Sequence, residues 1–408
     1  MNSIFDTVAD RRNTNSEKWN KIAISSIAAN SEAEPFWVAD MDFLPEPHIK
    51  AKAEELAKLG VFGYPSFPDF NKTAASWLER KHNWVVNEGS IAYSMGLLHG
   101  VSMCINLLTK KGDHILIPSP TYKPFRELCS LNDRVMEDYE LGYKDGAFYL
   151  DRERFIESAK KSKMILFCSP HNPSGLVFSQ EELEFVLGVA KDLDIPVVSD
   201  EIHGDLVHPG YTHIPMGKAN EKIGAETITL MAPSKTFNVA GEHSAIAIFS
   251  SDSTLNRFKH AQSALWLSTP GYLIGELTEA AYKNGLEWNE ELCRYLGENA
   301  ELISSFLEEN NLGIKMVNGN ASFVTFLDCS GVWDKIEKKV RENPDRYSSS
   351  SGGVLSRFFG VEASVAMNDG TWFGSQYKKF VRINYGTSRE RVYNALLRIK
   401  KAVESLKE

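Results

Sequence analysis

Three short apolar runs, each followed by a loop of polar and turn-forming residues, constrain the fold of this 408-residue chain more than any other feature. The runs cover residues 164–168, 195–199 and 227–230, and they are rich in β-branched and aromatic side chains. Uninterrupted apolar runs of this length are typical of strands buried on both faces of a parallel sheet. Because open α/β sheets bind their ligands at the carboxyl ends of such strands, the polar loops predict a site at that edge.

One polar residue after each run supplies the chemistry of the predicted site. Asn172 follows the first run, Asp200 ends the second, and Lys235 follows the third after Pro233 and Ser234 break the strand into a turn. A lysine desolvated in such a cleft can lose its proton and form a Schiff base. Each residue alone is explained by a turn, a helix cap or an exposed lysine, but three of them at one sheet edge indicate a site.

Strand and helix patterns alternate along most of the chain. Amphipathic helices are expected at 46–59 and 180–191, and Ser179 with Glu182 forms a capping box that starts the second helix. A strand is also expected over residues 35–43, in the run Pro-Phe-Trp-Val-Ala-Asp-Met-Asp-Phe. The alternation of strands and helices implies a mostly parallel sheet whose two faces are covered by helices.

Two further residues favour anionic ligands. Gly96 precedes an apolar helix expected at 101–108, and a glycine turn that opens a helix presents free backbone N–H groups and the positive end of the helix dipole. Arg382 lies in a strand-like segment near the C-terminus, and its planar guanidinium can bind a carboxylate through two hydrogen bonds. Alone, the glycine is a weak signal, and the arginine also fits an exposed strand position.

Charge and cysteine usage exclude several classes of protein. The net charge of −9 argues against nucleic acid or an anionic membrane as the main partner. The five cysteines are scattered and form no C-x-x-C pair, which predicts reduced thiols and no metal site. No apolar run approaches the roughly 20 residues of a membrane span and no secretory signal is apparent, so a cytoplasmic protein is expected.

Taken in order along the chain, Asn172, Asp200, Lys235 and Arg382 resemble the site of the pyridoxal-phosphate (PLP) enzymes of fold type I, the aspartate-aminotransferase superfamily. More narrowly, the chain is similar to the MalY/PatB branch of that superfamily, the C–S lyases of the cystathionine β-lyase type. The resemblance covers nearly the whole chain. It implies PLP as cofactor and an amino acid as the small-molecule substrate.

The resemblance also implies the architecture. The fold class is α/β, the PLP-dependent transferase fold type I, with a mostly parallel central sheet flanked by helices and a smaller α/β domain. Residues 1–45 would form an N-terminal arm and part of the small domain, 46–285 the large PLP-binding domain, and 286–408 the small C-terminal domain. A homodimer with shared active sites is implied, in which Tyr64 reaches the cofactor phosphate of the partner.

Roles for single residues follow from the same resemblance. Lys235 would bind PLP covalently and serve as the catalytic base, and Asp200 would keep the pyridine nitrogen protonated, because a carboxylate raises the pKa of an adjacent cation. Asn172 would donate to the phenolic oxygen of the cofactor, and Arg382 would hold the α-carboxylate of the substrate. The other implied contacts are Tyr122, His203, Gly96, Leu97, Leu98 and Ser234 with the cofactor, and Val38 and Ala39 with the substrate.

Two histidines favour the lyase branch. The resemblance implies a tyrosine three residues after the aspartate and an arginine eight residues after the lysine in a generic aminotransferase, but this chain has His203 and His243 there. Glu242 beside His243 departs from the pattern of the family. The predicted function is a C–S β-lyase that cleaves cystathionine or other S-substituted L-cysteines to a thiol, pyruvate and ammonia. The alternatives are a class I/II aminotransferase and, less favoured, a PLP-binding regulatory protein.

Overall fold

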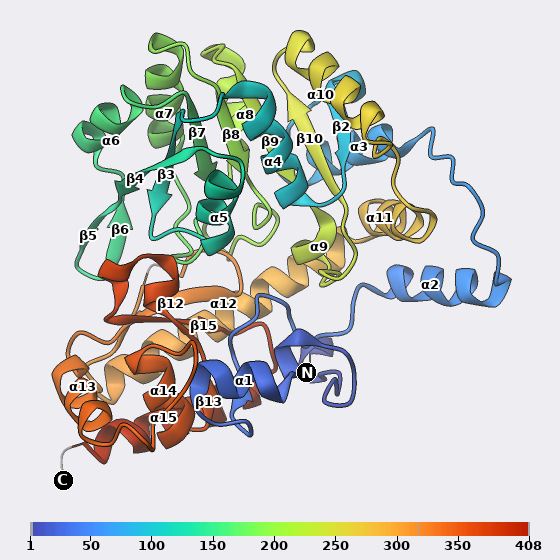
Figure 1. Cartoon of the computed structure of the whole chain (residues 1–408). Coiled ribbons are helices and arrows are strands. Elements are labelled where there is room, and N and C mark those ends of the chain that lie inside the picture. Colours follow the sequence, from blue (N-terminus) through green and yellow to red (C-terminus); the bar gives the residue numbers. More distant parts are fainter. Residues whose placement is uncertain (1–2, 318, 407–408) are drawn as a thin grey trace.

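A seven-stranded sheet lies at the centre of the larger part of the molecule (Figure 1). The structure is a computed structural model that describes residues 3–317 and 319–406. The strand order is β2-β10-β9-β8-β7-β3-β4, and every neighbouring pair is parallel except the two that involve β10. The predicted mostly parallel sheet is therefore confirmed. The strands are β2 (Ile91–Ser94), β3 (His114–Ser119), β4 (Val135–Glu140), β7 (Met164–Cys168), β8 (Val197–Asp200), β9 (Thr227–Met231) and β10 (Ala245–Phe249).

Helices cover both faces of this sheet because successive strand residues face opposite sides and both sides are apolar. Leu166 and Val198 pack into a core with α4, α5 and α10, whereas Ile165 and Val197 pack into a second core with α6, α7 and α8. The predicted capping box at the start of α7 is present. The helices are α4 (Leu97–Leu108), α5 (Lys123–Leu131), α6 (Arg152–Ala159), α7 (Gln180–Asp192), α8 (Met216–Ala219) and α10 (Asp252–Ala264).

A four-stranded antiparallel sheet of order β11-β12-β15-β14 forms a second layer in the lower part of Figure 1. Its strands and the helices around it come from the last third of the chain. The strands are β11 (Lys315–Met316), β12 (Val324–Asp328), β14 (Asn368–Asp369) and β15 (Phe380–Asn384). The helices are α12 (Leu286–Glu309), α13 (Trp333–Glu342), α14 (Val354–Glu362) and α15 (Arg389–Glu404).

The N-terminal segment packs on this second layer and not on the large sheet. Strand β1 (Glu34–Pro35) pairs in parallel with β13 (Val365–Ala366), and α1 (Lys21–Ala28) packs against α14. Phe5 is buried in the main hydrophobic core, so the first residues described are docked through this ring.

A group of three helices lies on the right of Figure 1, where α11 (Tyr272–Asn284) contacts both α2 (Pro47–Leu59) and α3 (Phe70–His82). The loop between α2 and α3 exposes several apolar side chains. The remaining short elements are β5 (Gly142–Lys144), β6 (Ala147–Tyr149) and α9 (Pro233–Thr236). All five cysteines are buried free thiols. Within the described residues, no helix combines the length and apolar character that crossing a membrane requires.

Three local predictions are wrong in detail. The strand expected over residues 35–43 is limited to β1, since the chain from Phe36 onward is irregular and side chains satisfy much of its backbone. Lys235 lies in the one-turn helix α9 instead of an open turn, because Pro233 at the first helical position is already fixed in a helical φ. Helix α4 begins at once after Gly96, four residues earlier than expected.

Candidate active site

A cavity of about 380 Å³ opens at the carboxyl edge of the central sheet. It collects residues from the ends of β7, β8 and β9, from the start of α4 and from the segment before α2. Ten of the residues predicted from the sequence line it: Ala39, Gly96, Leu97, Leu98, Tyr122, Asn172, Asp200, His203, Ser234 and Lys235.

Lys235 presents its amine to this cavity. Its Nζ donates a hydrogen bond of 2.5 Å to the backbone carbonyl of Ala39. Burial lowers the pKa of Lys235 to about 8, with Asp40 and Asp200 opposing the shift and Arg382 adding to it. The unprotonated amine, which a nucleophile or a general base requires, is therefore far more populated near neutral pH than for an ordinary exposed lysine.

Asp200 ends β8 beside the lysine and is buried. Burial raises the pKa of Asp200 to about 7, although the Ile202 N–H donates to its Oδ1 at 3.0 Å and favours the charged form. The neighbouring charge of Glu201 raises this pKa further. A cation placed against the Asp200 carboxyl would restore its ionised form.

Arg382 extends from β15 toward Asn172. Its Nη1 donates to Asn172 Oδ1 at 3.2 Å, and its Nη2 donates to Asn368 Oδ1 at 2.7 Å and to the Trp37 carbonyl at 2.8 Å. The Nε is buried without a partner, and within the described residues no carboxylate pairs with this guanidinium. A buried guanidinium without a counter-ion is costly, and a carboxylate bound beside it would offset this cost.

The start of α4 leaves backbone N–H groups without a side-chain cap. Gly96 has φ of +86°, and no side chain caps the free N–H groups of the first helical turn. A Cβ built on Gly96 would lie 3.4 Å from the Cβ of His243, so His243 stands directly beside this turn. Uncapped N–H groups with the positive end of a helix dipole suit a phosphate group.

Tyr122 and His203 flank the lysine. Tyr122 precedes α5, and burial raises the pKa of its hydroxyl. Burial lowers the pKa of His203 to about 3, and the charges of Lys235 and Arg382 add to this shift. His203 is therefore a neutral imidazole at physiological pH, and its Nδ1 lies 2.9 Å from Ser322 Oγ.

Three predicted residues lie outside the cavity lining. Arg382 lies behind Asn172, and the Val38 side chain does not line the cavity, although its carbonyl accepts a hydrogen bond from Asn384. Tyr64 is fully exposed on the loop between α2 and α3. Within one chain this tyrosine does not take part in the site.

Several lining residues were missed as site residues by the sequence reasoning. Cys168 is the last residue of β7 and pairs with Asp200 in the sheet register. The predicted strand over residues 164–168 would have been enough to place Cys168 at this edge of the sheet. His99 lies in the first turn of α4. It was missed because the helix was expected to begin at residue 101, whereas a helix beginning directly after Gly96 would have placed His99 at the cavity. Glu242 and His243, which were singled out from the sequence for their departure from the aminotransferase pattern, also line the cavity.

Comparison with known proteins agrees with this geometry. Residues 38–399 match the protein family described as aminotransferase class I and II. The chain belongs to this family. It is 32% identical to the cystathionine beta-lyase PatB of Bacillus subtilis (strain 168), over 98% of this chain and 99% of the relative. It is 25% identical to the protein MalY of Escherichia coli (strain K12), over 99% of both chains.

Solved structures share the whole fold. Cystalysin from Treponema denticola, which contains a pyridoxal 5′-phosphate cofactor, superposes with a TM-score of 0.87 at 27% identity and covers 98% of this chain and 99% of its own. The PLP-bound C-S lyase from Staphylococcus hominis superposes with a TM-score of 0.86 at 27% identity, over 99% of this chain and 98% of that one. The predicted fold class and superfamily are therefore confirmed.

Proposed function

We propose that this protein is a PLP-dependent C–S β-lyase that cleaves cystathionine or other S-substituted L-cysteines to a thiol, pyruvate and ammonia. The observation that carries the proposal is one cavity in which the low-pKa amine of Lys235 lies beside the high-pKa carboxyl of Asp200. Perturbed acids and bases of opposite type in one cleft are typical of active sites. The cystathionine beta-lyases and C-S lyases among the similar proteins support the reaction class.

The residues present fit the cofactor. The uncapped start of α4 suits the phosphate, the Asp200 carboxyl suits a protonated pyridine nitrogen, and the Lys235 amine suits the aldehyde. Tyr122 and Asn172 line the same cavity, where a ring and its phenolic oxygen would lie. When bound, PLP supplies an electron-withdrawing ring that stabilises negative charge at the substrate Cα.

The protein residues would divide the remaining work. Arg382 would bind the substrate α-carboxylate through its guanidinium and so orient the Cα–H bond toward Lys235. The Lys235 amine would take the Cα proton as general base, the Cβ–S bond would break, and the thiolate would leave and be protonated. Addition of water to the remaining three-carbon fragment would yield pyruvate and ammonia.

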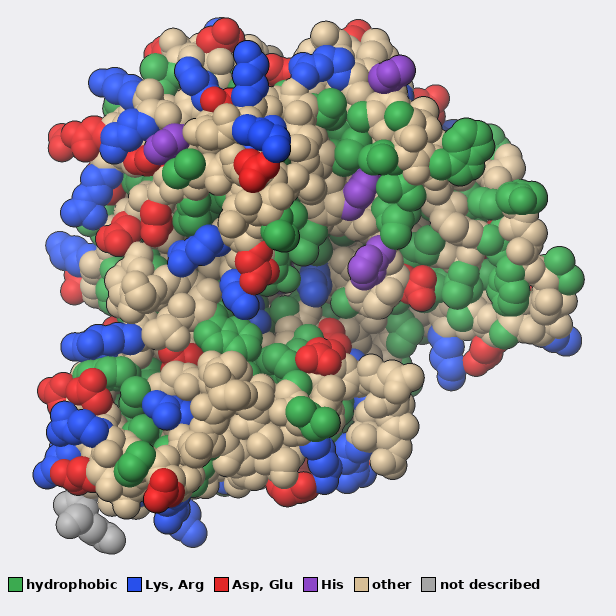
Figure 2. All heavy atoms as spheres, viewed as in Figure 1, with side chains coloured by type: hydrophobic (Ala, Val, Ile, Leu, Met, Phe, Trp, Pro, Cys, Tyr) green, Lys and Arg blue, Asp and Glu red, His purple; other side chains and the backbone are tan. Residues whose placement is uncertain are grey.

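We also propose that the protein works as a homodimer with shared sites. The loop between α2 and α3 exposes the apolar side chains of Val61, Phe62 and Tyr64, and Trp266 is 93% exposed. Figure 2 shows hydrophobic side chains gathered on this side of the molecule. A patch of this kind is typical of an interface with another protein surface. A second copy that covers it would bring Tyr64 to the partner's cavity.

An aminotransferase is the second candidate, because the family that matches residues 38–399 is described as aminotransferase class I and II. The same Lys235 base would serve both reactions, and the two differ in whether the Cβ–S bond breaks. The site chemistry discriminates weakly between them. His203 and His243 favour the lyase because, as expected from the resemblance, they replace the tyrosine and arginine of generic aminotransferases.

The deciding experiment measures pyruvate and free thiol released from L-cystathionine by the purified, PLP-loaded protein without added keto acid. Equal release of both products is expected. The variant Lys235→Ala should release neither, because the amine is the proposed base. Conversion of the cofactor to its amine form by amino acids, without thiol release, would establish the aminotransferase instead, and unchanged turnover by Lys235→Ala would overturn the proposed role of the lysine.

A further inference from the structure

The segment 37–42 lies between the two residues that we assign to the substrate. Arg382 Nη2 donates to the Trp37 carbonyl at 2.8 Å, and Lys235 Nζ donates to the Ala39 carbonyl at 2.5 Å. A shift of this segment would therefore move the carboxylate-binding guanidinium and the base together. The geometry of both groups depends on what holds the segment in place.

Two asparagines hold the segment from the side of the cavity. Asn238 follows Lys235 by three residues with φ of +56°, and Asn384 follows Arg382 by two. Through their side-chain amides they bind backbone groups of Val38, Asp40, Met41 and Phe43. The segment is thus attached to the residues that directly follow α9, which contains Lys235, and to β15, which contains Arg382.

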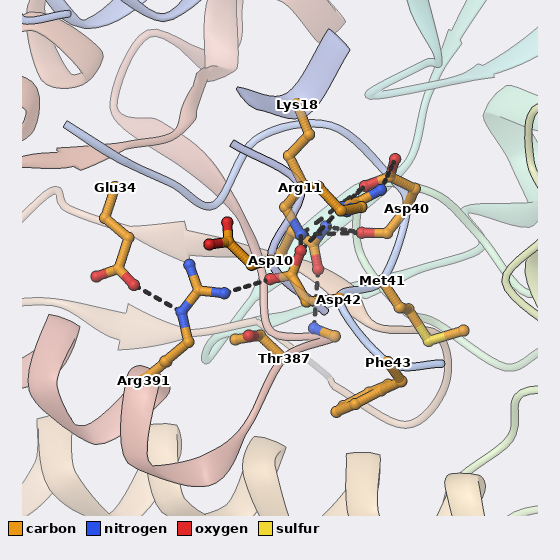
Figure 3. A network of polar contacts seen from close by, with 12 residues as sticks. Asp10, Arg11, Lys18, Glu34, Asp40, Met41, Asp42, Phe43, Thr387 and Arg391 are labelled. Atoms are coloured by element: carbon orange, nitrogen blue, oxygen red, sulfur yellow. Dashed lines mark hydrogen bonds and ion pairs between the residues drawn. The ribbon is translucent and has the colours of Figure 1, made fainter. Parts of the chain in front are cut away.

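Arg11 and Lys18 of the N-terminal arm and Arg391 of α15 also hold the segment, through buried charges (Figure 3). The carboxylate of Asp42 is fully buried and accepts from Arg11 Nη2 at 2.8 Å, from Lys18 Nζ at 3.0 Å and from Arg391 Nη1 at 2.9 Å. Lys18 is itself only 1% exposed. Burial raises the pKa of Asp42, but these three cations outweigh it and leave the pKa below its usual value.

The arm also neutralises a charge that acts on the catalytic lysine. Arg11 binds both oxygens of Asp40, at 2.9 and 3.0 Å, and Lys18 Nζ donates to the Asp40 carbonyl at 3.1 Å. Asp40 directly follows Ala39, and its negative charge raises the pKa of Lys235. The other charged or titratable groups that act on Lys235 are Asp200, His203 and Arg382.

We propose that Arg11 and Lys18 are positioning residues of the active site, which fix the segment 37–42 against Lys235 and Arg382 and mask the charge of Asp40. This inference rests on the proposed function. Arg11 and Lys18 do not line the cavity and would act through Asp40 and Asp42. Its removal should therefore change how well the site works and at which pH, while the cofactor contacts remain.

The experiment compares Arg11→Ala and Lys18→Met with Arg12→Ala in the PLP-loaded protein. Arg12 is the matched control, because it belongs to the same arm but is exposed and pairs only with Asp10. A displacement of about 1 Å at the substrate carboxylate should lower kcat/KM for L-cystathionine roughly 10- to 100-fold in the two test variants, mainly through KM for Arg11→Ala. Arg12→Ala should keep the wild-type value.

A second readout distinguishes positioning from a general loss of stability. The pH midpoint of the change in cofactor absorption, which follows the proton on the Lys235 nitrogen, should rise by about half a unit to one unit in Arg11→Ala, because Asp40 is no longer neutralised. Arg11→Lys should restore most of the wild-type midpoint, and Asp40→Asn should lower it. Asp200, His203 and Arg382 are unchanged in all these variants.

Two results would overturn the inference. One is a wild-type kcat/KM and midpoint in Arg11→Ala. The other is a loss of activity that follows a lower melting temperature, with an unchanged midpoint, since this would make the arm merely structural. If the wild-type protein binds PLP but releases no pyruvate, the proposed function fails. The pH midpoints of the cofactor absorption would then still test whether Arg11 masks the charge of Asp40. No PLP binding at all would overturn both.

Discussion

At the scale of single residues, the buried carboxyl of Asp200 should lower the stability of the cofactor-free protein when it ionises. Its carboxyl is buried with one backbone donor, and burial raises its pKa to about 7, although the nearby Lys235 opposes this shift. In the unfolded chain the same group titrates near 3.8. The folded protein without cofactor therefore binds more protons than the unfolded chain between these two values, and its stability falls as pH rises through that window.

This linkage gives a prediction for the cofactor-free protein. The Asp200 contribution should cost roughly 4 kcal/mol of unfolding free energy between pH 4 and pH 7, and Asp200→Asn should abolish it. Urea unfolding of both proteins at pH 4 and pH 8 measures the difference. Asparagine keeps an oxygen that accepts from the Ile202 N–H, so the comparison isolates the charge. An identical pH dependence in both proteins would refute the buried-carboxyl interpretation.

At the scale of elements, the first turn of α4 depends on one glycine. Gly96 has φ of +86° and ψ of 162°, a region that is nearly exclusive to glycine. Gly96→Ala should therefore move the Leu97 and Leu98 N–H groups and lower PLP affinity about tenfold or more, as measured by equilibrium dialysis. Gly112→Ala is the control, because Gly112 also has positive φ but open space around it. Equal affinities for wild type and Gly96→Ala would exclude this turn as the phosphate site.

The same scale shows what the sequence could and could not predict. The strands β7, β8 and β9 could be predicted because a strand buried on both faces is an uninterrupted apolar run. The predicted strand ends then placed Cys168, Asp200 and the segment before Lys235 at one edge of the sheet. The segment 35–43 was misread, because its pattern resembles a strand while its hydrogen-bond partners are side chains as distant as Asn384. Local pattern contains no information on such partners.

The network of the N-terminal arm was missed for the same physical reason. Arg11 and Lys18 lie in a polar stretch without periodicity, which is equally compatible with a solvated leader. Only the fold brings Arg391, which lies 349 residues from Asp42 in the sequence, onto the same carboxylate. Buried ion networks need several partners at once, so no single position signals them.

At the scale of the whole molecule, a single chain exposes large apolar side chains to solvent. Phe62 is 60% and Trp266 93% exposed, and Phe62 packs edge-on against Tyr272 of α11 with ring centroids 6.5 Å apart. Phe62→Asp should place a charge in the proposed dimer interface and convert the protein to a monomer of low activity, as seen by sedimentation and the pyruvate assay. The exposed Tyr149 lies on the hairpin strand β6, and Tyr149→Asp should leave the dimer intact. A Phe62→Asp variant that remains dimeric would place the interface elsewhere.

Active sites shared between two subunits predict that two inactive variants can restore activity when they are mixed. If Tyr64 completes the partner's site, a mixture of Lys235→Ala and Tyr64→Ala subunits contains mixed dimers in which one site has both an intact lysine and an intact tyrosine. After subunit exchange, half of the dimers are mixed, so activity should approach about a quarter of the wild-type value, well above either variant alone. Each variant incubated alone at the same total concentration is the control. A mixture no more active than the average of its components would show that Tyr64 serves its own chain or none.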